Sequence, residues 1–254
     1  MEAKNTESII KKNRIKDCLA SLIPDSHTLN YSFGYNLLEL MLATAVGAVI
    51  IAGTYTANVI VAKQYERLAS FSDVQDMGIP SLQVVSRDVR MAGYTALDAS
   101  VESPFGTITA PITITDAFFN NFDKIAVIYD RDTATRERIS YYVAQRSAAT
   151  ATELAKYGLY MDVESWDGTV WTTTTSQALV ADYIEDLQFV GSDADASGNP
   201  RFVDIFMVFR SKRLLPGNIT YTKPAETAGN YNYSFTDRYF RDEFSAIINV
   251  KNLR

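Results

Sequence analysis

Cysteine and histidine are almost absent from this chain of 254 residues, which contains one of each, Cys18 and His27. Both lie upstream of a long hydrophobic run. Beyond residue 34 there is no thiol for a disulfide, no imidazole for general-base catalysis, and neither side chain to hold zinc. Serine–histidine, cysteine–histidine and zinc chemistry are therefore excluded from that part of the chain, and we expect no enzymatic activity. Oxygen-ligand metals such as calcium stay open.

Positive charge is also in short supply. The chain has a net charge of −6 and an isoelectric point near 4.9. Such a chain lacks the basic surface on which counterion release and nucleic-acid binding depend, so we expect no nucleic-acid partner. Hydrophobic residues make up 47% of the sequence, which is enough to form a folded core.

Charge is missing altogether between Leu40 and Ala62, whereas residues 1–34 are polar and carry both signs. At about 1.5 Å per residue, a helix over Leu40–Ala62 spans the roughly 30 Å hydrocarbon layer of a bilayer. The sequence therefore predicts a transmembrane helix over about residues 37–62. Basic residues upstream favour a cytoplasmic N-terminus, which would leave the larger C-terminal part outside the cytoplasm.

The helix is predicted to continue to residue 94, because apolar residues recur at steps of three or four positions. Charged residues such as Asp88 are assigned to the other face. Gly78 and Pro80 predict a kink or a break near residues 78–80, since proline removes a donor and clashes with the preceding turn. Gly93 is the expected helix end. The apolar stripe consists of Phe71, Val74, Gly78, Leu82, Val85, Val89 and Ala92.

Beyond residue 95 the sequence changes to short runs of β-branched and aromatic residues separated by Gly, Asn, Asp and Pro. Alternation within these runs favours an antiparallel sheet with one covered face. The predicted fold class is α+β, with a long N-terminal hydrophobic helix followed by a β-rich domain over residues 95–254. The run Thr172–Thr175 is treated as a short low-complexity stretch. The expected strands are Thr107–Thr115, Lys124–Tyr129, Arg138–Ala144, Leu159–Val163, Ile184–Val190, Phe202–Arg210 and Phe244–Asn249.

The hydrophobic run begins with the sequence SFG-YNLLELMLATAVGAVI. This segment resembles type IV prepilins, in which a glycine is followed by an aromatic residue, small or apolar residues, and a glutamate at the fifth mature position. The resemblance implies that residues 1–34 are a leader, that a membrane aspartyl peptidase cuts after Gly34, and that Tyr35 becomes an N-methylated amino terminus. Tyr35 and Asn36 replace commoner residues, and the leader is long. The matching residues are Gly34, Tyr35, Leu37, Leu38, Glu39 and Leu40.

Glu39 is unusual on physical grounds alone, because a carboxylate in a membrane helix costs a few kcal/mol of insertion free energy, and less near the interface. Cleavage after Gly34 would expose an amino group at Tyr35, about 6 Å away along the helix. In a filament, that group on one subunit could pair with Glu39 of a neighbour and set the stagger between them. The alternative is that Glu39 marks the headgroup boundary of an ordinary single-span anchor.

Further segments narrow the resemblance to PilW-like minor pilins and the related J-type pseudopilins. They are Ser81–Tyr94 (SLQVVSRDVRMAGY), Leu179–Phe189 (LVADYIEDLQF) and the closing DRYFRDEFSAIINVKNLR. The resemblance implies a minor pilin that acts in pilus assembly or initiation, near the filament tip. Its partners would be other pilin subunits, the prepilin peptidase and the inner-membrane assembly platform.

The same resemblance implies a location. The protein would lie in the bacterial inner membrane before assembly and in a pilus or pseudopilus afterwards. Two alternatives to the minor pilin are a pseudopilin of a type II secretion system and a membrane-anchored adhesin or binding module. In the latter, aromatic residues such as Trp166 and Trp171 could line a sugar-binding surface, although packing explains most such residues.

The sequence DADASGN, with an aspartate further along, matches the spacing of a calcium loop. Alternating oxygen-bearing side chains and a glycine turn can direct several ligands to one hard cation. The alternative is a polar hairpin turn, since the same residue types form turns. Calcium is the one possible cofactor. The candidate ligands are Asp193, Asp195, Ser197, Asn199 and Asp204.

Two pairs of adjacent acids also stand out, Glu185-Asp186 and Asp242-Glu243. Neighbouring residues of a strand point to opposite faces, and no nucleophile lies close by in the sequence. Acid–base catalysis is therefore not expected from them. We expect both pairs to be surface charge.

Overall fold

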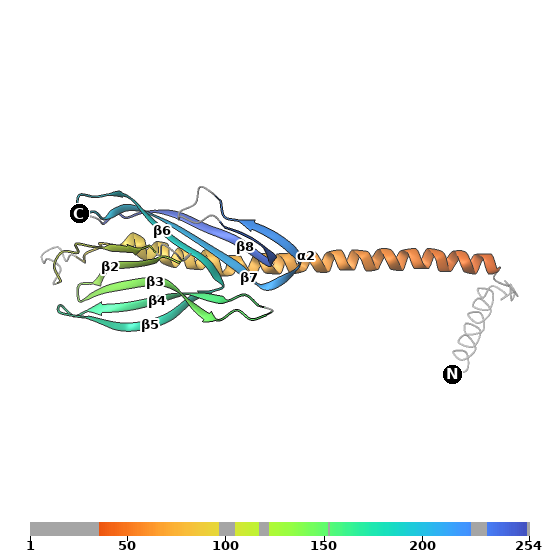
Figure 1. Ribbon diagram of the computed structural model, residues 1–254, viewed down its shortest axis with the longest axis horizontal. Coiled ribbons are helices and arrows are strands. Elements are labelled where there is room, and N and C mark those ends of the chain that lie inside the picture. The colour runs from red at the N-terminus through yellow and green to blue at the C-terminus, as the bar shows by residue number, and fades with distance from the viewer. Residues whose placement is uncertain (1–35, 97–104, 117–121, 152, 225–232, 253–254) are drawn as a thin grey trace, which may run out of the picture. The chain divides into compact units, whose positions relative to one another are not determined.

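The computed structural model describes residues 36–96, 105–116, 122–151, 153–224 and 233–252. One long helix is followed by antiparallel strands, so the predicted α+β class is confirmed (Figure 1). The chain divides into two compact units, residues 1–56 and 57–254. Helix α2 (Leu37–Met91) contributes its first turns to one unit and its remaining turns to the other.

In the second unit, α2 packs one face against the sheets. Val74, Val85 and Val89 are fully buried there, as the predicted apolar stripe requires. Phe71 lies at the edge of this face and packs on Phe240, with the two ring centroids 5.8 Å apart. The buried residues of the helix are Ser70, Val74, Gly78, Ser81, Val85, Ser86, Asp88 and Val89.

Pro80 does not end the helix. Of the kink or break predicted near residues 78–80, the break does not occur, because helix α2 continues through Pro80 to Met91; the kink stays a prediction. A proline at this position cannot donate a hydrogen bond to the carbonyl of Asp76, four residues earlier. Asp76 and Pro80 are both exposed, so water can solvate the carbonyl that the proline leaves free.

The strands are mostly longer than the sequence predicts, although the first is shorter. Strand β5 is missing from the prediction, because Thr172–Thr175 was treated as low complexity. These threonines are exposed and show no apolar alternation, which is the pattern of a strand with no covered face. The strands are β1 (Ile112–Thr115), β2 (Lys124–Asp132), β3 (Thr135–Ser147), β4 (Lys156–Trp166), β5 (Trp171–Asp182), β6 (Ile184–Ala194), β7 (Pro200–Thr222) and β8 (Ser234–Asn249).

These strands form two antiparallel sheets, with the orders β1-β2-β3-β4-β5 and β6-β7-β8. The residues before β2 connect the sheets. Phe122 forms a parallel bridge with Leu187 of β6, and the amide of Asp123 donates a hydrogen bond to the carbonyl of Leu187 at 2.8 Å. The carboxylate of Asp123 also accepts the amide N–H of Phe189 at 2.9 Å. Strand β6 is thereby fixed beside the first sheet.

The core of the second unit lies where α2 meets both sheets. The closest approach is at Gly78, where an added Cβ would lie 2.1 Å from Cε2 of Phe244. At its end the helix turns through Gly93, which has a φ of 75° and donates its amide to Ile128 at 2.9 Å. The expected end at Gly93 is confirmed. Strand residues of the core include Ile125, Val127, Ile139, Tyr141, Leu159, Leu187, Phe189, Val203, Ile205, Met207, Phe209 and Ile248.

A first prediction concerns this close approach. Gly78→Val should lower the free energy of unfolding by about 1–3 kcal/mol, because the new side chain overlaps the buried ring of Phe244. Urea denaturation of the full chain in detergent, followed by circular dichroism, measures the change. Gly53→Val is the matched control, since a Cβ at that helical position would meet nothing within 4 Å apart from its own stretch of helix. Equal midpoints for the two variants would contradict the prediction.

Candidate functional site

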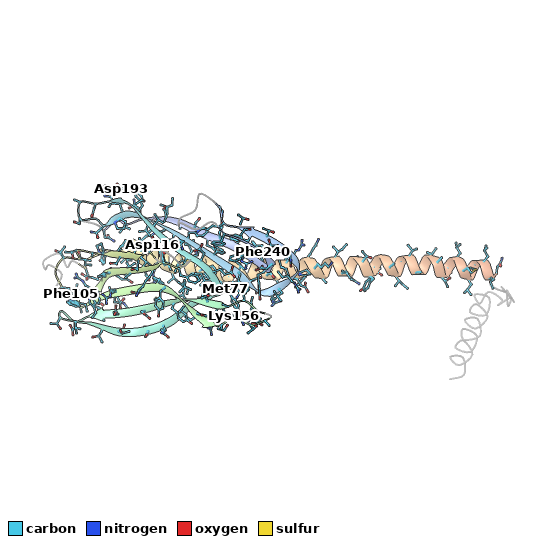
Figure 2. All side chains as sticks on the ribbon, in the orientation of Figure 1. Met77, Phe105, Asp116, Lys156, Asp193 and Phe240 are labelled. Atoms are coloured by element: carbon cyan, nitrogen blue, oxygen red, sulfur yellow. The ribbon has the colours of Figure 1, made fainter. Side chains whose placement is uncertain are left out.

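The first candidate site is the exposed apolar part of α2. Between Leu37 and Leu68 nearly every side chain is exposed, and none is buried. Side chains project outward around the helix in the first unit (Figure 2). Among the described residues, α2 is the one helix long and apolar enough to cross a membrane. This segment is therefore compatible with single-pass membrane anchoring. Its large exposed apolar residues are Leu37, Leu38, Leu40, Met41, Leu42, Val46, Val49, Ile50, Ile51, Tyr55, Ile60, Val61, Tyr65 and Leu68.

The helix begins with a polar cap that places Glu39 in its first turn. The carbonyl of Asn36 accepts the amide of Glu39 at 2.8 Å, and the Asn36 side-chain oxygen accepts the amide of Leu38 at 3.4 Å. Asparagine is a favoured residue at this position. A carboxylate in the first turn is stabilised by the positive end of the helix dipole. The start of the helix thus explains how Glu39 is tolerated here.

Glu39 is exposed and has no ion-pair partner among the described residues. Its carboxylate is therefore free to meet a cation from outside the described part of this chain. Gly34 and Tyr35, the predicted cleavage and methylation positions, lie outside the described residues. The proposed pairing with Glu39 therefore stays a prediction.

A second feature lies at the C-terminal end of α2, where Asp88 is completely buried. Its Oδ2 accepts the hydroxyl of Tyr141 at 2.5 Å, and its Oδ1 accepts Nε of Arg87 at 2.9 Å. Burial and the neighbouring Asp88 carboxylate raise the pKa of Tyr141, so its hydroxyl remains a donor. The same carboxylate raises the pKa of Arg87 through a hydrogen bond.

The assignment of Asp88 to the solvent face is therefore wrong. Asp88 lies three residues after Val85 and four before Ala92, which is the spacing of the apolar stripe itself. That spacing could have identified Asp88 as a helix residue facing the core. Its charge is accommodated because Arg87 reaches it from the exposed side and Tyr141 reaches it from β3.

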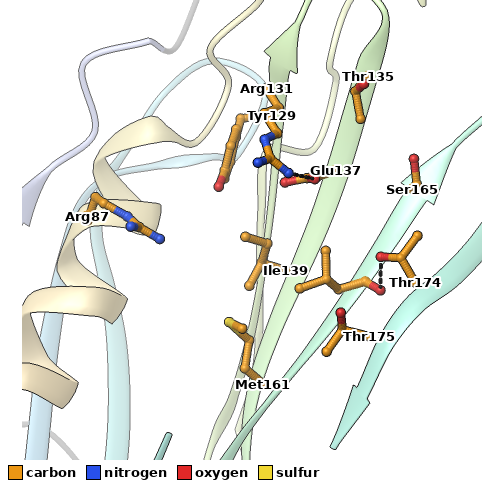
Figure 3. Close-up of a pocket in the computed structure, with 11 residues that line it drawn as sticks. Arg87, Tyr129, Arg131, Thr135, Glu137, Ile139, Met161, Ser165, Thr174 and Thr175 are labelled. Atoms are coloured by element: carbon orange, nitrogen blue, oxygen red, sulfur yellow. Dashed lines mark hydrogen bonds and ion pairs between the residues drawn. The ribbon is translucent and has the colours of Figure 1, made fainter. Parts of the chain in front are cut away.

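Beside this group, a pocket of about 630 Å³ opens between α2 and the sheet β2–β5 (Figure 3). Arg87 and Arg131 stand at its sides, and Nη1 of Arg131 lies 3.1 Å from Oε1 of Glu137. Burial raises the pKa of Tyr129 in the same wall to about 12. Ile139, Met161 and Val163 contribute its apolar lining. The lining residues are Arg87, Tyr129, Arg131, Thr135, Glu137, Ile139, Met161, Val163, Ser165, Thr174 and Thr175.

The proposed calcium loop is the hairpin between β6 and β7. Oδ1 of Asp195 accepts the amides of Ser197 and Asn199, each at 2.8 Å, and these bonds lower the pKa of Asp195. Gly198 has a φ of 85° and closes the turn. This geometry supports the alternative of a polar hairpin turn.

The remaining candidate ligands of the loop point to other partners. Asp193 forms an ion pair with Arg201 at 3.7 Å, and Asp204 is part of β7, opposite Val190 of β6. The side-chain nitrogen Nδ2 of Asn199 donates a hydrogen bond to the backbone carbonyl of Thr109 at 3.2 Å. No group of three or more His, Cys, Asp or Glu in the described ranges is placed to hold a metal ion.

Comparison of the chain with protein-family models, with curated proteins and with solved structures finds no match. The resemblance to prepilins therefore rests on the residues themselves, above all on Gly34 and Glu39 and the apolar run after them.

A second prediction tests the buried carboxylate. Tyr141→Phe should lower the free energy of unfolding by about 1.5–3 kcal/mol, because a buried carboxylate loses a hydrogen-bond donor. The matched control is Tyr142→Phe on the opposite face of β3, where the hydroxyl donates to the half-buried Asp162 at 3.2 Å. The free energy of unfolding of that variant should fall by less than about 1 kcal/mol. Urea midpoints for the two variants that coincide would refute a special role for Asp88.

Proposed function

We propose that this protein is a minor subunit of a type IV pilus-like filament, which it joins through α2. The observation that carries the proposal is the exposed apolar surface of residues 37–62, in which Glu39 of the first turn is the single carboxylate. The prepilin-like residues Gly34 and Tyr35 precede it. No catalytic step is part of this role.

The first support is energetic. Each large apolar side chain of this segment would gain roughly 1.5–3 kcal/mol on leaving water. A helix that is apolar all round needs either a bilayer or other helices as its surroundings. A subunit that is first stored in the membrane and then packed into a filament meets each of these surroundings in turn.

The second support is Glu39. Moving an apolar helix from lipid to a bundle of helices brings little hydrophobic gain, because lipid tails are as apolar as leucine. Polar contacts then contribute strongly to the choice of register. Glu39 would pair with the new amino group at Tyr35 of a neighbouring subunit, a pair that only leader removal can create.

The sheet unit would lie at the filament surface, outside the cytoplasm. A pseudopilin of a type II secretion system would use the same leader, helix and sheets, so it remains the closest alternative. The adhesin alternative receives less support. Trp166 and Trp171 pack on each other with centroids 5.1 Å apart, and the guanidinium of Arg138 lies 4.7 Å from the Trp171 ring centroid. Their rings are thus partly occupied within the sheet.

A third prediction is that the leader is removed. Intact-mass analysis of the protein extracted from membranes should give a chain that starts at Tyr35 and carries one extra methyl group. A Gly34→Val variant should stay uncut and serves as the control. Filaments that contain subunits with residues 1–34 attached would overturn the proposed function.

A fourth prediction separates cleavage from assembly. Glu39→Gln should be cleaved normally, but its incorporation into filaments should fall roughly tenfold or more, as expected if a desolvated ion pair worth at least about 1.4 kcal/mol is lost. Glu66→Gln is the matched control, since Glu66 is an exposed acid further along the same helix. Quantitative immunoblots of sheared filaments and membranes measure the ratio. Equal incorporation of the two variants would remove Glu39 from the assembly step.

A further inference from the structure

The three-stranded sheet β6–β8 buries ionisable groups on the face that does not contribute to the main core. Asp186 pairs in register with Val208, and Gln188 pairs with Phe206. These four side chains are buried, yet Val208 and Phe206 do not belong to the core cluster around α2. The expectation that Asp186 is surface charge is therefore wrong.

Asp186 is at the centre of the buried groups on this face of the sheet. Nζ of Lys223 lies 3.0 Å from its Oδ2, and the side chains of Lys223 and Asp186 are 1% and 0% exposed. The hydroxyl of Tyr233 donates to the same Oδ2 at 3.0 Å, and Nε2 of Gln188 donates to Oδ1 at 2.9 Å. The Lys223 nitrogen also lies 4.9 Å from the ring centroid of Phe206. Amine and carboxyl are thus isolated from water.

This isolation changes the chemistry of the pair. Removing both ions from water carries a large desolvation penalty that an ion pair only partly offsets. Burial raises the pKa of Asp186, against the opposing effect of Lys223 and the two hydrogen-bond donors. Amide formation requires a neutral amine and a neutral carboxylic acid, which the passage of one proton from Nζ to the carboxylate would supply.

We propose that Lys223 and Asp186 form an intramolecular amide cross-link. The lone pair of Nζ attacks Cγ of Asp186, so that an N–C bond forms and the C–Oδ2 bond breaks. Oδ2 leaves as water, carrying the acid proton and one proton from Nζ. No oxidant or reductant is needed. The structure holds the two reactants in contact and away from water, with Nζ 3.0 Å from Oδ2, an oxygen bonded to the carbon that is attacked.

The side chains of Gln188 and Tyr233 are placed to assist the addition of the amine and the departure of water. Gln188 donates to Oδ1, where negative charge develops when the amine adds to the carboxyl carbon, as a donor in an oxyanion hole does. Tyr233 contacts Oδ2, the leaving oxygen, and its hydroxyl can pass a proton from the nitrogen to that oxygen. The backbone N–H of Lys223 donates a hydrogen bond to the backbone carbonyl of Tyr233 at 3.1 Å, which fixes the two residues side by side.

The cross-link would join β6 to the end of β7 and close a covalent loop through residues 186–223. Such a loop restricts the unfolded chain, as a disulfide does, in a part of the protein that contains no cysteine. This inference does not depend on the proposed function. A subunit of any filament or anchor would gain the same resistance to unfolding.

Tryptic peptide mapping of the purified full chain tests the proposal. Trypsin should release residues 157–201 and 214–238 as two peptides, and Pro224 protects the Lys223 bond whether or not the amide exists. We expect one branched species, lighter than the sum of the two peptides by one water molecule, with fragment ions that place the link at Asp186 and Lys223. Two linear peptides of full mass would show an ion pair only and overturn the proposal.

Two variants support the assignment. Lys223→Arg keeps the charge but removes the amine nucleophile, so it should give only linear peptides. Lys156→Arg is the matched control, because Lys156 forms an exposed ion pair with Glu153 at 3.0 Å. It should keep the branched species. A branched species of the same two peptides that survives Lys223→Arg would show that the link does not involve the Lys223 amine and would contradict the proposal. The wild-type measurement stands on its own if Lys223→Arg does not fold.

Discussion

The structure of the second unit depends on how closely α2 approaches its sheets. Gly78 lets the helix backbone lie against the ring of Phe244, and a side chain there would occupy the same space. Ten residues later, Asp88 is pressed against β3 with no exposed surface. Its burial is tolerated because Tyr141 and Arg87 supply donors for the carboxylate. Gly78, which has no side chain, and Asp88, a buried carboxylate with two protein hydrogen-bond donors, therefore fix the same interface.

The sequence allowed the helix and most strands to be predicted, because burial on one face leaves a periodic pattern. Val74, Val85 and Val89 follow the helical period and are all fully buried. Strand β5 escaped for the opposite reason, since Thr172–Thr175 are exposed and an edge strand needs no alternation. The helix does not break at Pro80, and part of the reason is that the lost hydrogen bond costs less where the freed carbonyl can be solvated. In this chain, Asp76 faces water.

The candidate sites also differ in how far they can be predicted from the sequence. Glu39 could be found from sequence, because its oddity is local: one acid beside an uncharged run. The loop at Asp195 could be found but not interpreted, since turn formers and calcium ligands are the same residue types. Asp186 and Lys223 are separated by 37 positions. Only the register of β6 on β7, together with the return of the chain after β7, brings them into contact, and neither follows from residue periodicity.

The buried charges of strand β6 help to fix the register of the three-stranded sheet. Glu185 pairs with Arg210 at 3.0 Å and with Arg241, which also contacts Asp237 at 2.7 Å. Apolar residues could fill this space at lower desolvation cost. They would tolerate a slipped register, however, whereas each of these ions has few acceptable positions. Because a slip by one residue would leave several charges buried without partners, the charges penalise every pairing of β6, β7 and β8 except the observed one.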